Sequence, residues 1–236
     1  MMTRRGLGCF AVAAGMLLGA CKRSSWIYRY RLAVEVETPE GPKTGSGVIE
    51  VRRAVAPWPL SYVDLSHGAM TIVAKGEAVV IDLGARGLLF ALLVGQDEKG
   101  RVGSPDAAGY LPAKVFLRTG ALRESDETQA DLETLRAYAD LAPAEIPFLV
   151  RFRDIDDPRS VEKVDPNDLA ASFGPGVRLL GASIEMTGDP VTTGIEKQLG
   201  WLAALKGGYL DGQFTGGGPA LSNILHGGNF KSSGGQ

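Results

Sequence analysis

The stretch that decides the fold is RYRLAVEVET, at residues 29–38. Every even-numbered position from Tyr30 to Val36 is apolar, and the odd-numbered positions are charged except for Ala33. A period of two is typical of a β-strand that buries one face. We therefore expect an amphipathic strand here, with the hydrophobic core on one side and solvent on the other.

A second strand follows at residues 48–53, after the turn-forming sequence EGPK at residues 40–43. If those four residues form the loop, Ile49 faces Val34 and Val51 faces Leu32 across an antiparallel pair. The apolar faces then coincide, which favours a hairpin in that register.

Three apolar runs come next, at residues 70–73, 78–83 and 88–94. The last two are almost continuously apolar, as in strands that are buried on both faces. Asp82 and Arg86 argue against a membrane span over residues 78–95, because each is costly in lipid. We expect these two runs to be central strands.

Helical and strand-like segments alternate in the second half of the chain. Helical spacing with capping signals occurs at residues 126–141, 165–174 and 194–205. Strand-like segments occur at residues 146–152 and 177–187. The expected fold class is α+β, with about seven mainly antiparallel strands and about three helices. A sheet packed by helices and a small open barrel both fit this pattern.

The composition changes after residue 206, since ten of the last thirty residues are glycine. Such a segment has few apolar side chains to offset the entropy lost on ordering. We therefore expect a single domain over residues 27–206, followed by a disordered tail at residues 207–236.

The first twenty residues have the features of a secretory signal peptide. Arg4 and Arg5 precede an apolar run over residues 6–19, and small residues precede Cys21. A charged start, a short apolar core and a small-residue cleavage site are typical of such signals. The run has about fourteen residues, fewer than the roughly 20 of a membrane-spanning helix. We expect residues 1–20 to be removed after export.

Residues 18–21 read Leu18-Gly19-Ala20-Cys21, and this stretch resembles the lipobox of bacterial lipoproteins. The resemblance implies that Cys21 begins the mature chain, that diacylglycerol is attached to its sulfur and that a fatty acid such as palmitate is attached to its amine. Two or three acyl chains anchor a protein stably, whereas one does so only marginally. Cys21 is therefore the expected lipidation site, and the bilayer its expected partner.

The residues around the anchor bear on export and sorting. In enteric-type lipoproteins an aspartate after the cysteine favours the inner membrane. Lys22 stands there instead, which favours the periplasmic face of the outer membrane. Residues 3–7 resemble a twin-arginine signal but lack its aromatic residue, so general and twin-arginine export both stay open. Residues 21–26 form only a short tether, which would hold the domain close to the bilayer.

Charge and cysteine content exclude several classes of function. Cleavage before Cys21 removes two of the 25 basic residues and none of the 27 acidic ones, which leaves 23 against 27 and a net charge of −4. Nucleic-acid binding is not expected without a basic patch. Cys9 and Cys21 are the only cysteines, so the mature chain has no disulfide and no cysteine zinc site. We expect no cofactor.

The densest acidic cluster is DIDD at residues 154–157. Asp154, Asp156 and Asp157 are candidate calcium ligands, because calcium prefers oxygen ligands. The complete calcium loop is absent, however, since no glycine follows in register and no glutamate closes it. A solvated turn after a strand is the alternative interpretation.

Catalytic motifs are weak. His67 lies in DLSHG at residues 64–68, but the members of a serine triad converge from separate elements. The only other histidine, His226, lies in the glycine-rich segment. Ser160 and Lys163 fit the Ser-x-x-Lys motif of penicillin-binding proteins, but the Lys-Thr-Gly motif at Lys43 precedes it, which is the wrong order. We assign no catalytic residue, and we expect Trp58 and Trp201 to be core or lid residues.

Residues 146–201 resemble a segment of uncharacterised bacterial secreted proteins. The matching stretches are IPFLV at 146–150, VDPNDLA at 164–170 and DPVTTGI at 189–195. The resemblance implies no activity. The leading hypothesis is a non-enzymatic envelope lipoprotein that binds a protein partner or forms part of an assembly. A carrier of a small or lipidic ligand, and a hydrolase whose site forms only in three dimensions, are the alternatives.

Overall fold

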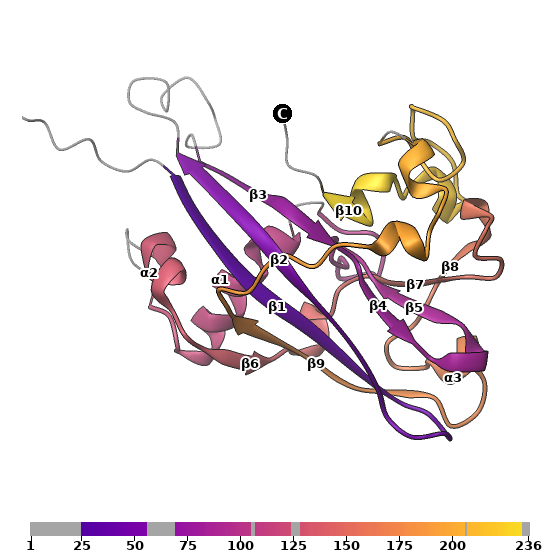
Figure 1. Cartoon of the computed structure of the whole chain (residues 1–236), viewed down its shortest axis with the longest axis horizontal. Coiled ribbons are helices and arrows are strands. Elements are labelled where there is room, and N and C mark those ends of the chain that lie inside the picture. The colour runs from indigo at the N-terminus through magenta and orange to yellow at the C-terminus, as the bar shows by residue number, and fades with distance from the viewer. Residues whose placement is uncertain (1–24, 56–68, 105–106, 124–127, 206, 233–236) are drawn as a thin grey trace, which may run out of the picture.

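The computed structural model of the chain describes residues 25–55, 69–104, 107–123, 128–205 and 207–232. It contains two antiparallel sheets and three α-helices, which confirms the expected α+β class with mainly antiparallel pairing (Figure 1). The six-stranded sheet has the order β10 (Lys231–Ser232), β3 (Ala69–Glu77), β2 (Lys43–Val55), β1 (Ser25–Glu37), β9 (Arg178–Met186) and β6 (Tyr138–Asp140). The four-stranded sheet has the order β4 (Val79–Asp82), β5 (Leu88–Ala91), β7 (Leu149–Phe152) and β8 (Val161–Lys163).

The helices are short and lie between the strands in sequence. The α-helices are α1 (Ala107–Thr119), α2 (Thr128–Thr134) and α3 (Ala170–Phe173). The 3-10 helices are η2 (Gly84–Arg86), η3 (Pro143–Glu145), η4 (Pro158–Ser160), η5 (Ile195–Lys197), η6 (Leu202–Leu205), η7 (Leu221–Asn223) and η8 (Gly227–Asn229). No helix within the described ranges is both long and apolar enough to cross a bilayer.

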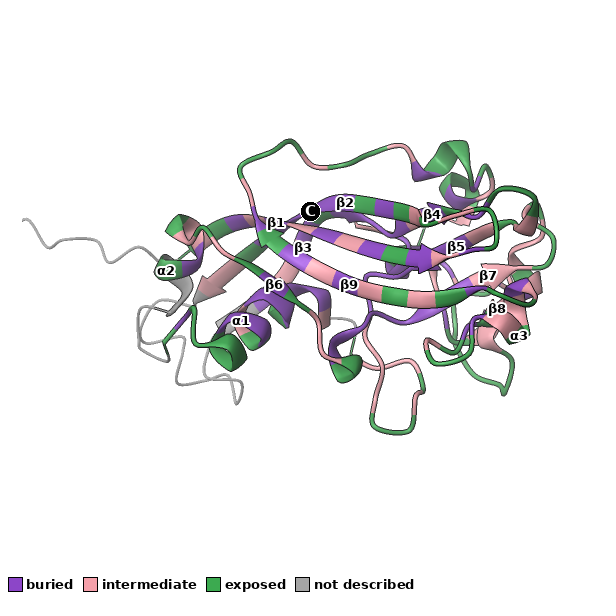
Figure 2. Ribbon diagram, turned by 90° about the horizontal axis from the view of Figure 1, so that it is seen from below, coloured by how far each residue is buried: buried purple, intermediate pink, exposed green. Residues whose placement is uncertain are grey.

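The hairpin of β1 and β2 forms as expected, but in a different register. Figure 2 shows the alternation of buried and less buried residues along the strands of the large sheet. Ile49 pairs with Tyr30, whereas the sequence placed it opposite Val34, so the predicted register is wrong by four residues. The turn lies earlier than expected, because the Gly41 N–H donates to the Thr38 carbonyl at 2.9 Å. The error is an even number of residues, so the same apolar faces still meet.

The β2 strand carries glycine where the small sheet crosses it. A Cβ atom added to Gly45 would lie 2.3 Å from the carbonyl oxygen of Val80 in β4. That separation is far below van der Waals contact, and the obstacle is backbone rather than a flexible side chain. The absence of a side chain at Gly45 therefore lets β4 approach the hairpin.

Replacing Gly45 with alanine should lower the free energy of unfolding by about 1–3 kcal/mol, because the added methyl group forces β2 and β4 apart. Gly181→Ala on β9 is the matched control, since its Cβ atom would enter open space. Urea denaturation of the two variants measures the difference. Equal midpoints for both variants would contradict this account of β4 packing.

Each face of the small sheet has its own hydrophobic core. Along β5 and just beyond it, Leu89, Ala91 and Leu93 belong to the first core, which is shared with the large sheet and α1. Phe90 and Leu92 belong to the second core, which is shared with the C-terminal part of the chain. This confirms that the apolar run at residues 88–94 is buried on both faces. The strand β4 lies at the edge of the small sheet rather than in its centre.

The helices differ most from the sequence predictions. The polar composition of residues 96–109 predicts a loop, but α1 already begins at Ala107. Its first turn is held by the hydroxyls of Tyr28 and Tyr30, which donate to the carbonyls of Gly109 and Ala108. The helix predicted at residues 126–141 ends at Thr134, and Tyr138–Asp140 instead forms β6. The open edge of β9 explains this difference, because it provides hydrogen-bond partners for β6.

Two further helix predictions are correct only in part. At residues 165–174 the α-helix is limited to Ala170–Phe173, because the Asp165 carboxylate accepts the Asn167 N–H at 2.9 Å and forms a turn. Gly174 ends the helix with a φ of 93°, as expected. At residues 194–205 the apolar stripe is buried, but it forms the 3-10 helices η5 and η6 rather than an α-helix.

The glycine-rich segment is packed rather than disordered over residues 207–232. Leu210, Leu225 and Phe230 are fully buried in the second core, and β10 pairs with β3. A few apolar residues therefore suffice to order the segment, because the small sheet offers them an apolar face. The domain extends from Ser25 to Ser232, beyond the expected range of 27–206.

Candidate functional site

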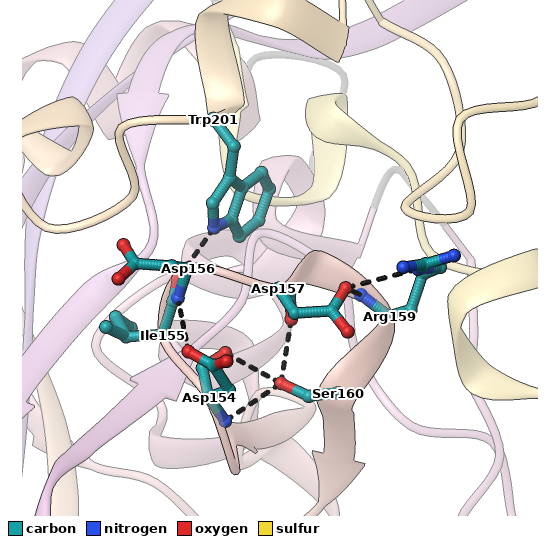
Figure 3. A network of polar contacts seen from close by, with 7 residues as sticks. All are labelled: Asp154, Ile155, Asp156, Asp157, Arg159, Ser160 and Trp201. Atoms are coloured by element: carbon teal, nitrogen blue, oxygen red, sulfur yellow. Dashed lines mark hydrogen bonds and ion pairs between the residues drawn. The ribbon is translucent and has the colours of Figure 1, made fainter.

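The acidic cluster lies in the loop between β7 and β8 (Figure 3). The Ser160 hydroxyl closes this loop. Its oxygen lies 2.7 Å from the carbonyl oxygens of Asp154 and Asp157, and it accepts the Asp154 N–H at 3.0 Å. Ser160 therefore holds the loop in shape, and its hydroxyl is engaged by backbone groups.

The three carboxylates proposed as calcium ligands do not converge. The Asp154 carboxylate accepts the Asp156 N–H at 3.0 Å, and that of Asp157 accepts the Arg159 N–H at 3.0 Å. The carboxylates of Asp154, Asp156 and Asp157 point in different directions (Figure 3). In the described part of the chain no group of three or more His, Cys, Asp or Glu side chains could hold a metal ion. The structure thus favours the solvated turn over the calcium site.

Asp157 remains charged at neutral pH. Hydrogen bonds from the Arg159 backbone N–H and guanidinium hold the pKa of the Asp157 carboxyl below its usual range. The contact between the Arg159 guanidinium and the Asp157 carboxylate, at 3.2 Å, is also an ion pair. The negative charge of Asp157 is therefore partly balanced by Arg159.

The motifs of penicillin-binding proteins are not assembled into a site. The Lys163 ammonium group lies 5.7 Å from the centre of the Phe148 ring and contacts the Gly100 carbonyl. The Ser160 hydroxyl contacts only its own loop in the bonds described above. Lys43 starts β2 in the other sheet. These positions give no support to a Ser-x-x-Lys nucleophile.

Trp201 connects the loop to the second core. Its indole N–H donates to the Ile155 carbonyl at 2.8 Å (Figure 3). Its ring packs edge-on against Phe152 and Phe230. This is the structural role expected of Trp201. The loop is thus fixed to the C-terminal segment through a side chain 46 residues away in sequence.

The remaining sequence candidates fall into two groups. The half-buried His226 contacts Tyr209 through its ring and accepts the Gly228 N–H at 3.1 Å, and burial lowers its pKa. His226 thus forms part of a turn in the C-terminal segment. Cys21, Trp58 and His67 lie outside the described residues.

A surface groove of about 450 Å³ adjoins the acidic loop. It is lined on one side by the loop and on the other by the C-terminal segment: Asp156, Asp157, Pro158, Arg159, Leu205, Leu210, Asp211 and Gly212. Three of these residues are acidic and one is basic, so the lining is negative. Sequence reasoning missed this groove, because it required the segment after residue 206 to be packed.

An exposed aromatic side chain follows the groove lining closely in sequence. Phe214 is 80% exposed, the highest exposure of any large apolar residue in the described ranges. It follows Gly212 of the groove lining by two residues. Ile224, in the same segment, is also exposed. Exposed aromatic side chains beside a groove are typical of sites where another protein binds.

The cavity between β1 and α1 offers little room for a ligand. It is lined by Tyr30, Ala108 and Leu111 among others, and has a volume of about 30 Å³. That space suits about one water molecule, whereas small-molecule sites measure roughly 300 Å³ or more. A hollow of about 210 Å³ at the hairpin tip is a surface feature beside the Arg86–Glu40 ion pair. These volumes do not favour the carrier hypothesis.

Comparison with known proteins identifies no relative. No protein-family model matches the chain, and searches of curated proteins and of solved structures found no match.

Proposed function

We propose that the chain is a membrane-anchored envelope lipoprotein that acts without catalysis and binds a protein partner through the groove beside Phe214. The observation that carries the proposal is the exposure of Phe214 next to a groove of about 450 Å³. A phenylalanine exposed to water loses the free energy that its burial would provide, about 1.5–3 kcal/mol. A partner that covers Phe214 recovers this energy on binding.

The groove is placed well for a partner away from the membrane. Only three residues separate Cys21 from Ser25, where β1 begins. An extended chain from Cys21 to Ser25 spans at most about 14 Å, so an anchor at Cys21 keeps the start of β1 near the bilayer. The C-terminal segment lies toward the other end of the long axis of the molecule (Figure 1). A groove in that position is accessible to a partner in the periplasm.

The charge of the groove indicates the chemistry of the partner. The groove lining contains three acidic residues, Asp156, Asp157 and Asp211, and one cation, Arg159, which is already paired with Asp157. Complementary charge steers association and excludes partners of like charge. The partner segment should therefore carry lysine or arginine together with an apolar side chain that packs on Phe214.

Site-specific photo-crosslinking tests this proposal. A photoreactive phenylalanine analogue at position 214, in cells that produce the full chain, should give one adduct of defined mass. The same analogue at position 138 is the matched control, because Tyr138 is also exposed, at 64%, but lies on β6 far from the groove in sequence and fold. No such adduct is expected from position 138.

The charge of the groove is tested in the same experiment. Asp156→Lys should lower the yield of the 214 adduct about tenfold, which corresponds to about 1.4 kcal/mol. Glu98→Lys makes the same charge change on an exposed residue outside the groove lining and should leave the yield unchanged. Identical adducts from positions 214 and 138, or equal yields from both lysine variants, would reject the groove as the binding site. Turnover of an envelope substrate by the purified chain would reject a non-catalytic role.

A further inference from the structure

Resting on the anchoring proposed above, we infer that the end of the large sheet where β1 begins is a surface that lies on anionic phospholipid headgroups. We define this surface, the anchor-proximal surface, by its residues Trp26, Ile27, Arg52, Arg53 and Tyr110. The occupant is the bilayer that holds Cys21, and not a second protein.

The sheet register places four of these residues at one end of the β1–β2 ladder, where Trp26 pairs with Arg53 and Ile27 pairs with Arg52. Because successive rungs face opposite sides of a sheet, Trp26 and Arg53 lie on one side of this end and Ile27 and Arg52 on the other. Tyr110, on α1, follows Gly109, whose carbonyl accepts the Tyr28 hydroxyl at 3.2 Å, so α1 meets β1 one residue beyond Ile27. Ile27 and Tyr110 are each 44% exposed, and Arg52 is exposed as well.

The charges at this end are unbalanced, unlike those further along the same strands. In the middle of the sheet Arg29 pairs with Glu50 at 2.7 Å and Arg31 pairs with Asp189. Arg52 has no ion-pair partner among the residues that the structure describes. Arg53 donates to the Thr71 hydroxyl at 2.9 Å, which leaves its charge uncompensated by that contact. Lys22 and Arg23 precede the strand and add two more positive charges.

A carboxylate near this end is engaged by backbone. Glu133 of α2 accepts the backbone N–H of Ile27 at 2.8 Å, which fixes α2 beside the first rungs of β1. The mixture of tryptophan, tyrosine and an aliphatic side chain with arginine is what the interface between lipid and water favours. Each arginine near an anionic leaflet contributes electrostatic attraction to the lipid phosphates.

The reach of the chain keeps this end of the sheet close to the bilayer in an anchored molecule. The span from Cys21 to Ser25 is at most about 14 Å, so the first rungs stay within about 14 Å of the acylated residue. The 13 residues of β1 then carry the hairpin turn about 40 Å from that end. Seating this end on the bilayer thus also sets the orientation of the whole domain.

Quenching of Trp26 fluorescence tests the inference. The full chain with Trp58→Phe is reconstituted in vesicles of phosphatidylethanolamine and phosphatidylglycerol, with lipids brominated near the headgroup. Quenching is expected in this protein and should be lost when Trp26→Phe is added, because the remaining Trp201 belongs to the C-terminal segment. Equal quenching in both proteins would place Trp26 away from the lipid and overturn the inference.

Charge reversal provides the second measurement. The unanchored Cys21→Ser chain is sedimented with the same vesicles, where Arg52→Glu should weaken binding at least about fivefold. Arg178→Glu is the control, since Arg178 is an exposed arginine at the opposite end of the β1 ladder, beside Glu37. Vesicles of phosphatidylcholine alone should bind all three chains equally weakly. Equal loss from both reversals would show a general charge effect and reject the surface.

Failure of the anchor and failure of the surface give different results. Mass spectrometry of the N-terminal peptide reports whether Cys21 is acylated. If it is not, the proposed lipoprotein is rejected, and coupling Cys21 to a maleimide phospholipid in a Cys9→Ser chain still measures Trp26 quenching. The surface is upheld or overturned by that quenching in either case.

Discussion

Phe230→Ala is expected to lower the free energy of unfolding by about 3–5 kcal/mol. Phe230 is completely buried and packs against the rings of Phe90, Phe152 and Trp201, at centroid distances of 6.4, 5.8 and 6.1 Å. Its truncation leaves a cavity in the second core and removes three aromatic contacts, two of them with rings on the small sheet. Chemical denaturation followed by circular dichroism measures the loss.

Phe214→Ala is the matched control for Phe230. It makes the same substitution in the same glycine-rich segment, but at a side chain that is 80% exposed. A surface change of this kind alters stability by at most about 0.5 kcal/mol. Equal stability of the two variants would contradict the packing of residues 207–232 in the second core. The C-terminal side of the groove would then also be unsupported.

Arg118→Ala is the substitution with the second-largest expected effect, about 3 kcal/mol of destabilisation. The Glu145 side chain is 2% exposed and accepts two hydrogen bonds from the Arg118 guanidinium, at 2.9 and 2.7 Å. It also accepts the Ala142 N–H at 2.8 Å. Without Arg118 a buried carboxylate loses its counter-ion, which costs 3–5 kcal/mol for fully buried pairs. We expect the lower end, because the Arg118 side chain is 42% exposed.

Two further variants distinguish the loss of the buried ion pair from the loss of an arginine side chain in general. Arg153→Ala breaks an exposed pair with Glu162 and should cost at most about 1 kcal/mol. Arg118→Met combined with Glu145→Leu removes both charges and should restore most of the stability that Arg118→Ala loses. A double variant no more stable than Arg118→Ala would indicate that packing, and not charge, determines the effect.

The same pair predicts a dependence of stability on pH. Burial raises the pKa of Glu145, but the hydrogen bonds from Arg118 and Ala142 outweigh it and leave the pKa below its ordinary value. A carboxylate with a lowered folded-state pKa stabilises the fold fully above its unfolded pKa, about 4.3, and less as pH falls through the folded value. Glu145→Gln should therefore flatten the stability profile below about pH 4.3. If the free energy of unfolding of Glu145→Gln depended on pH below about 4.3 as that of the parent chain does, this account would be contradicted.

Local patterns in the sequence predicted the strands well. A strand buried on one face alternates apolar and polar residues, and a strand buried on both faces is continuously apolar. The alternation at residues 29–38 and the apolar run at residues 88–94 both correspond to strands with the expected exposure. The register of the hairpin was not predictable to the residue, since shifts of four residues keep the same faces in contact. Only the position of the turn distinguishes such registers.

Helices and the candidate site depended on contacts that the sequence does not display. Residues 138–140 continue a helical pattern, yet they pair with β9 because that strand has an open edge. The glycine-rich segment is poor in apolar residues, yet it is ordered because its few apolar side chains pack on one face of the small sheet. The groove is formed by residues that lie about 50 positions apart, so no local pattern could have indicated it. The carboxylates of Asp154 and Asp157 were visible in the sequence, but their use in turns was not.

The order of strands in the large sheet has a consequence for biosynthesis. The central strand β1 is made first, but its neighbour β9 lies about 150 residues later, and the second core is incomplete until Phe230 has been added. Pairing over such separations is slow to form. A nascent chain of this topology can pair β1, β2 and β3 early, but it cannot complete the large sheet or the second core until translation is nearly finished.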